Sequence, residues 1–153
     1  MTVLPVERGV SDAARYIDRT TRDWQRYLRN SKVLGDADAV QDELAAVYQE
    51  CRVRDWDGFD AMPVEQDTLQ NASVLLESLP LGIPSPSIGA EPDGHLTLEW
   101  HRSANRTLSV SVDAQGDLHY AALVGPNRRF GKEAFFGETP NVILELIQLV
   151  YAT

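Results

Sequence analysis

The chain has 153 residues, 43% of them hydrophobic and 24% charged, and its formal net charge is −9. These values are typical of one globular domain with a proper hydrophobic core. No window approaches the roughly 18 apolar residues of a membrane span, and residues 1–10 lack the basic start and apolar run of a signal peptide. The single cysteine, Cys51, excludes an internal disulfide, so the sequence predicts a cytoplasmic protein.

The charge is divided unevenly along the chain. Residues 1–32 contain seven Arg or Lys and four Asp or Glu, whereas residues 33–153 contain seven and nineteen, a balance of −12. An acidic body repels phosphate, which argues against direct binding to nucleic acid. We expect a basic appendage at residues 1–35 and an α+β domain at residues 36–153.

The appendage is predicted to be a helix that runs from about residue 11 to residue 31. Its apolar residues share one stripe at helical spacing. The opposite face carries five arginines that advance by four, three, four and three: Arg15, Arg19, Arg22, Arg26 and Arg29. This face is either a solvated surface or a contact surface for an acidic protein, including the acidic body of a second copy.

Two further helices are predicted at residues 36–52 and 64–79, the second with Pro63 at its first position. The connector at residues 55–62 contains a turn signal at Gly58, because glycine accepts a positive φ. We expect Trp56 and Phe59 to pin this connector to the body.

The stretch from a short strand near Ile88 to residue 124 is predicted to be an antiparallel meander. Apolar and polar residues alternate in its three longer strands, so one face is apolar and the other polar. A turn at residues 114–116, with Gly116 in the left-handed conformation, sets Ser111 opposite His119. Residues 126–138 are then expected to form a loop.

The closing segment is predicted to be a strongly apolar helix, with Thr139 as its cap and Pro140 at its first position. Together these elements predict a two-layer α+β fold. It consists of a four-stranded antiparallel meander packed against the C-terminal helix and one or two of the preceding helices.

Several segments from about residue 43 onward match one linear pattern. They are Trp56-Asp57-Gly58 with Ala61 and Pro63, SLPLGIPSPSIGAEPDGHLTLEWHRS, TLSVSVDAQGDLHYAALVG and GKEAFFGETPNVILELI. In these segments the chain resembles a widespread family of small, uncharacterised bacterial proteins. The resemblance implies no activity, cofactor or catalytic residue. It implies that the residues before Asp36 are an addition to a shared body, and that the protein belongs to a two-gene accessory or defence-type operon.

Two sets of side chains on the polar face are candidates for chemistry. Ser111 opposite His119, with Glu99 nearby, has the outline of a nucleophile, a base and an orienting group. The alternative is a solvated face of cross-strand hydrogen bonds. For a metal, only His101 with Glu99 or His119 is expected to converge, because His95 lies about 20 Å from His101 along the strand. No metal site and no cofactor are predicted.

The loop expected after residue 125 is a candidate for binding. Arg128, Arg129 and Lys132 lie there among glycines and phenylalanines, a composition suited to gripping a phosphate or an acidic partner. The alternative is a surface excursion with Phe135 and Phe136 in the core.

Three functions are compatible with these patterns. The leading hypothesis is a non-enzymatic protein-binding or accessory protein that binds another protein, or itself in a homo-oligomer, and no membrane. The second is an acidic inhibitor or antitoxin-like protein that imitates nucleic acid for a basic target. The third, of a different class, is a small hydrolase or transferase that uses Ser111, His119 and Glu99.

Overall fold

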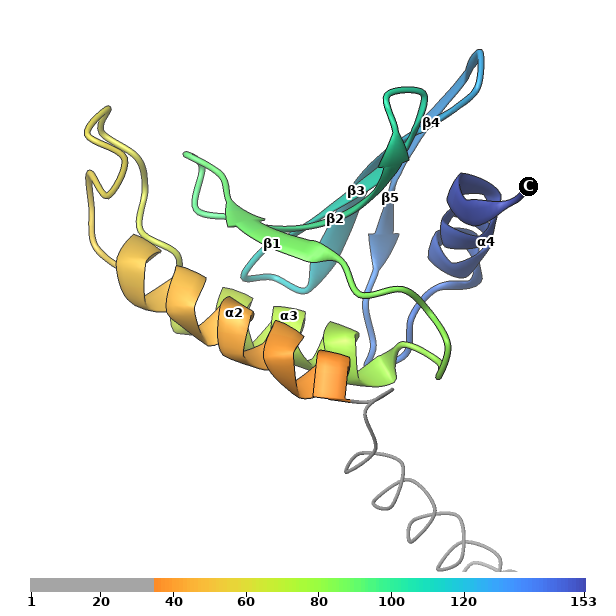
Figure 1. Cartoon of the computed structure of the whole chain (residues 1–153). Helices are drawn as coiled ribbons and strands as arrows, with labels where there is room; N and C mark the ends of the chain where they lie inside the picture. The colour runs from red at the N-terminus through yellow and green to blue at the C-terminus, as the bar shows by residue number, and fades with distance from the viewer. Residues whose placement is uncertain (1–34) are drawn as a thin grey trace, which may run out of the picture. The chain divides into compact units, whose positions relative to one another are not determined.

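The computed structural model describes residues 35–153 (Figure 1), so the predicted first helix and its arginine stripe lie outside the described residues. None of the helices in this part is long and apolar enough to cross a membrane. The elements in chain order are α2 (Gly35–Cys51), α3 (Gln66–Ser78), β1 (Ser87–Ala90), β2 (Leu96–Ser103), β3 (Arg106–Val112), β4 (Asp117–Val124), β5 (Asn127–Ala134) and α4 (Asn141–Tyr151).

The strands form one antiparallel sheet of five strands in the order β1-β2-β3-β4-β5, so each strand pairs with its neighbour in the sequence. The prediction of four strands is therefore wrong. Residues 127–134, expected to lie in a loop, pair with β4 from Asp117↔Ala134 to Val124↔Asn127. The alternation of apolar residues does not reveal this strand, because β5 lies at the sheet edge and carries charged residues on both faces, without an apolar period.

Gly131 is a strand residue and does not mark a turn. It lies opposite Tyr120 in the β4–β5 pair, and its backbone does not have a positive φ. A Cβ added there would lie 2.5 Å from the Tyr120 hydroxyl oxygen. The tyrosine ring therefore covers the glycine, an aromatic–glycine cross-strand pair that helps to pin the register of an edge strand.

The predicted hairpin between β3 and β4 is confirmed. Ser111 lies opposite His119, and the Asp113 N–H donates to the Asp117 carbonyl at 3.2 Å. Gly116 has a φ of 86°. This register places every second residue of both strands on the apolar face, as the alternation predicts.

The helices pack on one face of the sheet and form the second layer, which confirms the two-layer α+β class (Figure 1). α4 contacts β2, β3 and β4, and α3 contacts β2 and β3. The core between the layers is one cluster that includes Leu44, Leu75, Leu98, Trp100, Leu108, Val110, Leu118, Ile143, Leu146, Ile147 and Val150. The Trp100 indole is buried and its N–H donates to the Pro84 carbonyl at 2.7 Å.

The first turns of two helices differ from the prediction. α3 begins at Gln66, because the Val64 N–H donates to the Cys51 carbonyl and the buried Val64 lies in the extended connector. α4 begins at Asn141, after an N-cap at Pro140. The Thr139 hydroxyl shares a hydrogen bond of 2.6 Å with the Ser78 hydroxyl, so it joins the two helices and does not cap α4.

Only one of the two connector aromatics holds the connector. Trp56 packs against the core and its indole N–H donates to the Met62 carbonyl at 2.8 Å. Phe59 is 88% exposed, so the expectation that it anchors the connector is wrong.

Candidate functional site

The open face of the sheet is the side opposite α2, α3 and α4 (Figure 1). It is formed by the strand residues between the core residues, in three cross-strand rows. These rows are Gly89–Thr97–Ser111–His119–Lys132, Ser87–Glu99–Ser109–Ala121–Phe130 and His101–Thr107–Leu123–Arg128. Every residue in these rows is exposed or half-buried, so the open face meets solvent along its whole length.

The three catalytic candidates, Ser111, His119 and Glu99, lie on this face, but they do not make the contacts with one another that the prediction requires. The Ser111 hydroxyl donates to Glu91 Oε1 at 2.9 Å. His119 Nε2 lies 3.0 Å from Asp113 Oδ2. Glu99 is exposed in the neighbouring row. Within residues 35–153 no hydrogen bond joins Ser111 to His119, so the outline of nucleophile and base is not assembled here.

Asp113 is the buried acid of the open face, with only 7% of its surface exposed. Burial alone would raise the pKa of Asp113, but the Asp117 N–H, the His119 ring and the Gln115 N–H all hydrogen-bond to the carboxylate. These donors outweigh burial, and the pKa of Asp113 lies below its usual value. Asp113 therefore holds the β3–β4 turn and orients His119.

His95 belongs to the same cluster, contrary to the expectation that only His101 could converge with His119. The rings of His95 and His119 stack with their centroids 5.6 Å apart. His101 lies two rows away from His119, in the row of Arg128. His95 precedes β2 and reaches His119 diagonally, a geometry that depends on how the turn before β2 closes.

The group that could hold a metal ion within the described residues is Glu91, Asp93 and His95, whose ligand atoms lie within 4.8 Å of one another. Carboxylates and imidazoles are ligands that Zn²⁺ accepts. Each of the three has a protein partner, however. Glu91 accepts from Ser111, Asp93 Oδ1 accepts the His95 N–H, and Asp93 Oδ2 lies 3.4 Å from His95 Nδ1. These contacts account for the cluster without an ion.

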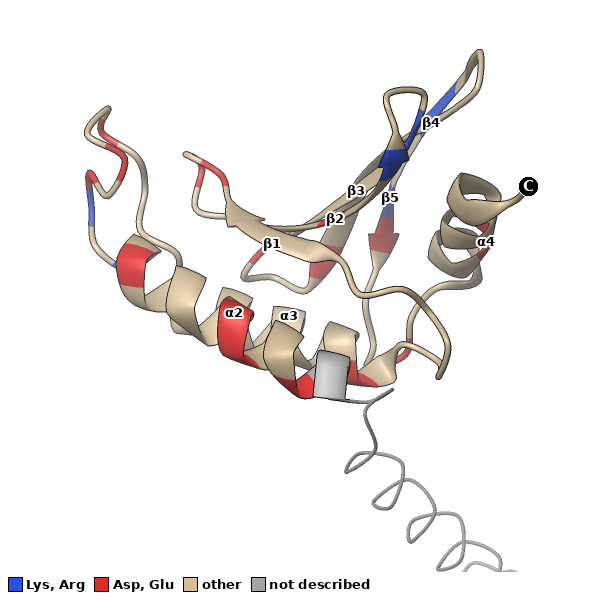
Figure 2. Cartoon of the chain, viewed as in Figure 1, with Lys and Arg blue, Asp and Glu red and all other residues tan. Residues whose placement is uncertain are grey.

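Charge is segregated along the open face and its ends (Figure 2). Acids gather where β2 and β4 begin: Glu91, Asp93, Asp113 and Asp117. Arginines lie toward the other end of the strands, at Arg102 and Arg128. Lys132 lies nearer the acids and forms an ion pair with Asp117 at 3.1 Å.

The three loop cations of the prediction fall on two different faces. Arg128, Phe130 and Lys132 alternate along β5 on the open face, and we call these three residues the β5 stripe. Phe130 is 82% exposed between its two cations. Arg129 pairs with the buried Ala122 and so lies on the helix-covered side.

The two phenylalanines after β5 do not behave alike. Phe135 packs partly against the core, whereas Phe136 is 89% exposed. The interpretation that both are inserted in the core is therefore correct for Phe135 only.

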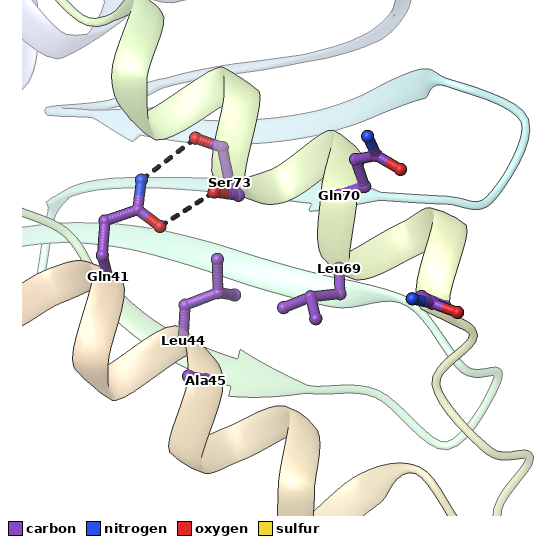
Figure 3. Close-up of a pocket in the computed structure, with 7 residues that line it drawn as sticks. Gln41, Leu44, Ala45, Leu69, Gln70 and Ser73 are labelled. Carbon is purple, nitrogen blue, oxygen red and sulfur yellow. Dashed lines mark hydrogen bonds between the residues drawn. The ribbon is translucent and has the colours of Figure 1, made fainter.

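A shallow groove of about 440 Å³ lies between α2 and α3 (Figure 3). Gln41 and Ser73 close it at one end with two hydrogen bonds: Gln41 Nε2 donates to the Ser73 carbonyl at 3.1 Å, and the Ser73 hydroxyl donates to Gln41 Oε1 at 3.0 Å. The remaining lining residues are Leu44, Ala45, Gln66, Leu69 and Gln70. None of these side chains titrates, so the groove offers no acid–base chemistry.

Cys51 is the last residue of α2 and belongs to the hydrophobic core. It is buried, and burial followed by the neighbouring Glu50 raises the pKa of its thiol. A raised pKa disfavours the thiolate, which is the reactive form.

Comparison of the chain with protein-family models, with curated proteins and with solved structures finds no significant match. The functional interpretation therefore depends on the residues of the open face and on the connector.

Proposed function

We propose that the protein is a non-enzymatic binding protein that docks an acidic protein surface on the open face of its sheet. The observation that carries this proposal is the β5 stripe, in which an exposed phenylalanine stands between two cations on one face of an edge strand. Aromatic and arginine side chains contribute most of the binding energy at many protein interfaces.

The surroundings of the stripe support a protein partner over nucleic acid. Arg128 can form a bidentate pair with a carboxylate, and Phe130 offers apolar area that a partner can remove from water. Residues 33–153 carry a balance of −12, which opposes a phosphate backbone. Ser111 and His119, which an enzyme of the predicted kind would use together, are each engaged by a different carboxylate.

The test is capture of protein partners by the tagged full chain in a lysate of its native host, with the partners identified by mass spectrometry. We expect Phe130→Ser and Arg128→Glu each to reduce recovery of a specific partner at least about tenfold. The chain offers two matched controls: Arg129→Glu changes the adjacent cation on the other face, and Phe136→Ser changes an equally exposed phenylalanine outside the sheet.

Two outcomes decide the proposal. Partner recovery that falls for the stripe variants and persists for both controls supports it. Recovery that is equal in all four variants, or that is lost equally in all four, shows that the stripe is not the binding surface.

A further inference from the structure

The connector at residues 52–63, called here the connector loop, is held by hydrogen bonds from its own aspartates. Asp57 Oδ1 accepts the N–H groups of Phe59 at 2.8 Å and of Ala61 at 3.1 Å. Asp55 Oδ1 accepts the Asp60 N–H at 2.7 Å, and the Asp55 N–H donates to the Ala61 carbonyl at 2.8 Å. The loop is therefore closed upon itself.

The loop is also fastened to the body. The Met62 N–H donates to the Pro92 carbonyl in the turn between β1 and β2 at 2.8 Å, and the Trp56 side chain packs against the core. Within the loop, the Trp56 indole donates to the Met62 carbonyl at 2.8 Å. Ala61 is buried. The residues of the Trp56-Asp57-Gly58 and Ala61 pattern thus build the loop, and the side chains between them are displayed.

Two non-glycine residues of the loop, Asp55 and Asp60, have positive φ values of 63° and 65°. Such conformations persist where surrounding contacts impose them, and they concentrate at binding sites. A loop held in one conformation before it binds loses little entropy on binding.

The loop displays apolar side chains with an acidic surround. Phe59 is 88% exposed, Val53 56% and Met62 46%. Three aspartates of the loop, Asp55, Asp57 and Asp60, and two acids of the adjoining turn, Glu91 and Asp93, lie in this corner (Figure 2). Arg54 is paired with Asp60 at 3.1 Å, and Arg52 is the other cation here.

This surface complements the β5 stripe, in which an exposed phenylalanine lies between Arg128 and Lys132. Lys132 also forms an ion pair with Asp117 of its own chain. The two surfaces are far apart in one molecule. The loop is bonded to the turn before β2, whereas β5 is the opposite edge of the sheet. The four strand spacings between β1 and β5 amount to about 19 Å.

We propose that the connector loop of one copy docks on the β5 stripe of a second copy, with Phe59 against Phe130 and the loop acids near Arg128 and Lys132. This inference rests on the proposed function and names the partner as the chain itself. In a two-fold arrangement of two copies, the loop of each copy would meet the stripe of the other, so the same contact would be made twice.

Direct pairing of two β5 edges is the competing arrangement. An antiparallel pair centred on Phe130 would place Arg128 of each copy opposite Lys132 of the other. Like charges directly opposite one another destabilise a strand pair, and charged residues protect natural sheet edges in this way. The stripe is therefore suited to a side-chain contact and opposes extension of the sheet.

Sedimentation velocity on the purified full chain, from about 1 μM to about 1 mM, tests the inference. We expect wild type to form a dimer within this range. Phe59→Ser and Phe130→Ser should each raise the dimer dissociation constant at least about tenfold. Phe136→Ser and Arg129→Glu should leave it unchanged. All four side chains are exposed, so circular dichroism is expected to show the same fold for each variant.

Mixing Phe59→Ser with Phe130→Ser separates docking from a structural effect. In the mixed dimer an intact loop meets an intact stripe once, whereas neither variant alone has any intact contact. We therefore expect more dimer in the mixture than in either variant alone. No gain on mixing, or a wild type that stays monomeric throughout the range, overturns the inference. Stripe-dependent capture of a different protein by a monomeric wild type would overturn this inference and leave the proposed function standing.

Discussion

The two faces of the sheet are built by the same strands and have opposite roles. In β2, Leu96, Leu98 and Trp100 are buried against the helices, whereas Glu99 and His101, between and beside them, are exposed. A step of one residue therefore moves a side chain from the core to the solvent. Substitutions on the covered face should change folding stability, and substitutions on the open face should change binding.

The sharpest way to test this contrast uses two adjacent residues. Leu98→Ala removes a fully buried side chain from the core and should lower the free energy of unfolding by about 3 kcal/mol. Glu99→Ala, next to it on the open face, should change that free energy by no more than about 0.5 kcal/mol. Urea denaturation of both variants measures the difference. Equal losses would show that the open face is also packed.

Asp113 is expected to be the exception on the open face, because it is buried and accepts several hydrogen bonds. Asp113→Asn keeps the size of the side chain and removes its charge. We expect a loss of about 1 to 3 kcal/mol in the free energy of unfolding at pH 7.

The pH dependence of this effect has a definite sign. The pKa of Asp113 is lowered in the folded state, so the unfolded chain binds more protons as the solution is acidified. The stabilisation is complete above the unfolded pKa, about 3.9, and is lost as the pH falls through the lower folded pKa. The free energies of unfolding of wild type and Asp113→Asn, measured by denaturation at a series of pH values, should thus converge as the pH falls below the unfolded pKa. A difference that is independent of pH would exclude the carboxylate as its cause.

The smallest expected effect concerns the hydrogen bonds between β3 and the C-terminus of α4. Arg106 Nη1 donates to the carbonyls of Leu149 at 2.9 Å and Ala152 at 2.8 Å, at the C-terminus of α4. A cation there also opposes the negative end of the helix dipole. Arg106→Gln should lower the free energy of unfolding by about 1 kcal/mol and speed hydrogen exchange in the last turn of α4. Arg102→Gln, in the same part of the sheet, is the matched control and should have no effect.

Strands with an apolar period could be predicted from the sequence, and the others could not. β3 and β4 follow from alternation and from the Asp113–Asp117 turn, whose register is confirmed. β5 has charged residues on both faces, and what holds it is its pairing with β4 and the tyrosine over Gly131. The pairing with β4 and the Tyr120 ring over Gly131 cannot be inferred from the residues of β5 alone, because both depend on β4.

The candidate site on the open face could be predicted only in part, because some of its contacts depend on how turns close. The neighbouring positions of Ser111 and His119 follow from the register, but their partners Glu91 and Asp113 lie in turns, where carboxylate direction depends on the closed loop. The exposure of Phe59 does not follow from the sequence, because an aromatic residue in a connector more often packs against the body. Here Trp56 anchors the connector, and the carboxylates of Asp55 and Asp57 hold its backbone by hydrogen bonds.

The position of α4 after all the strands has a consequence for biosynthesis. The ribosome synthesises every strand before the helix that supplies Ile143, Leu146, Ile147 and Val150 to the core. Synthesis of the 17 residues from 135 to 151 takes about 1 to 3 s at ordinary translation rates. Until α4 is present, the apolar side chains of the strands that it covers are exposed to solvent. Chaperones that recognise such surfaces have their opportunity in this interval.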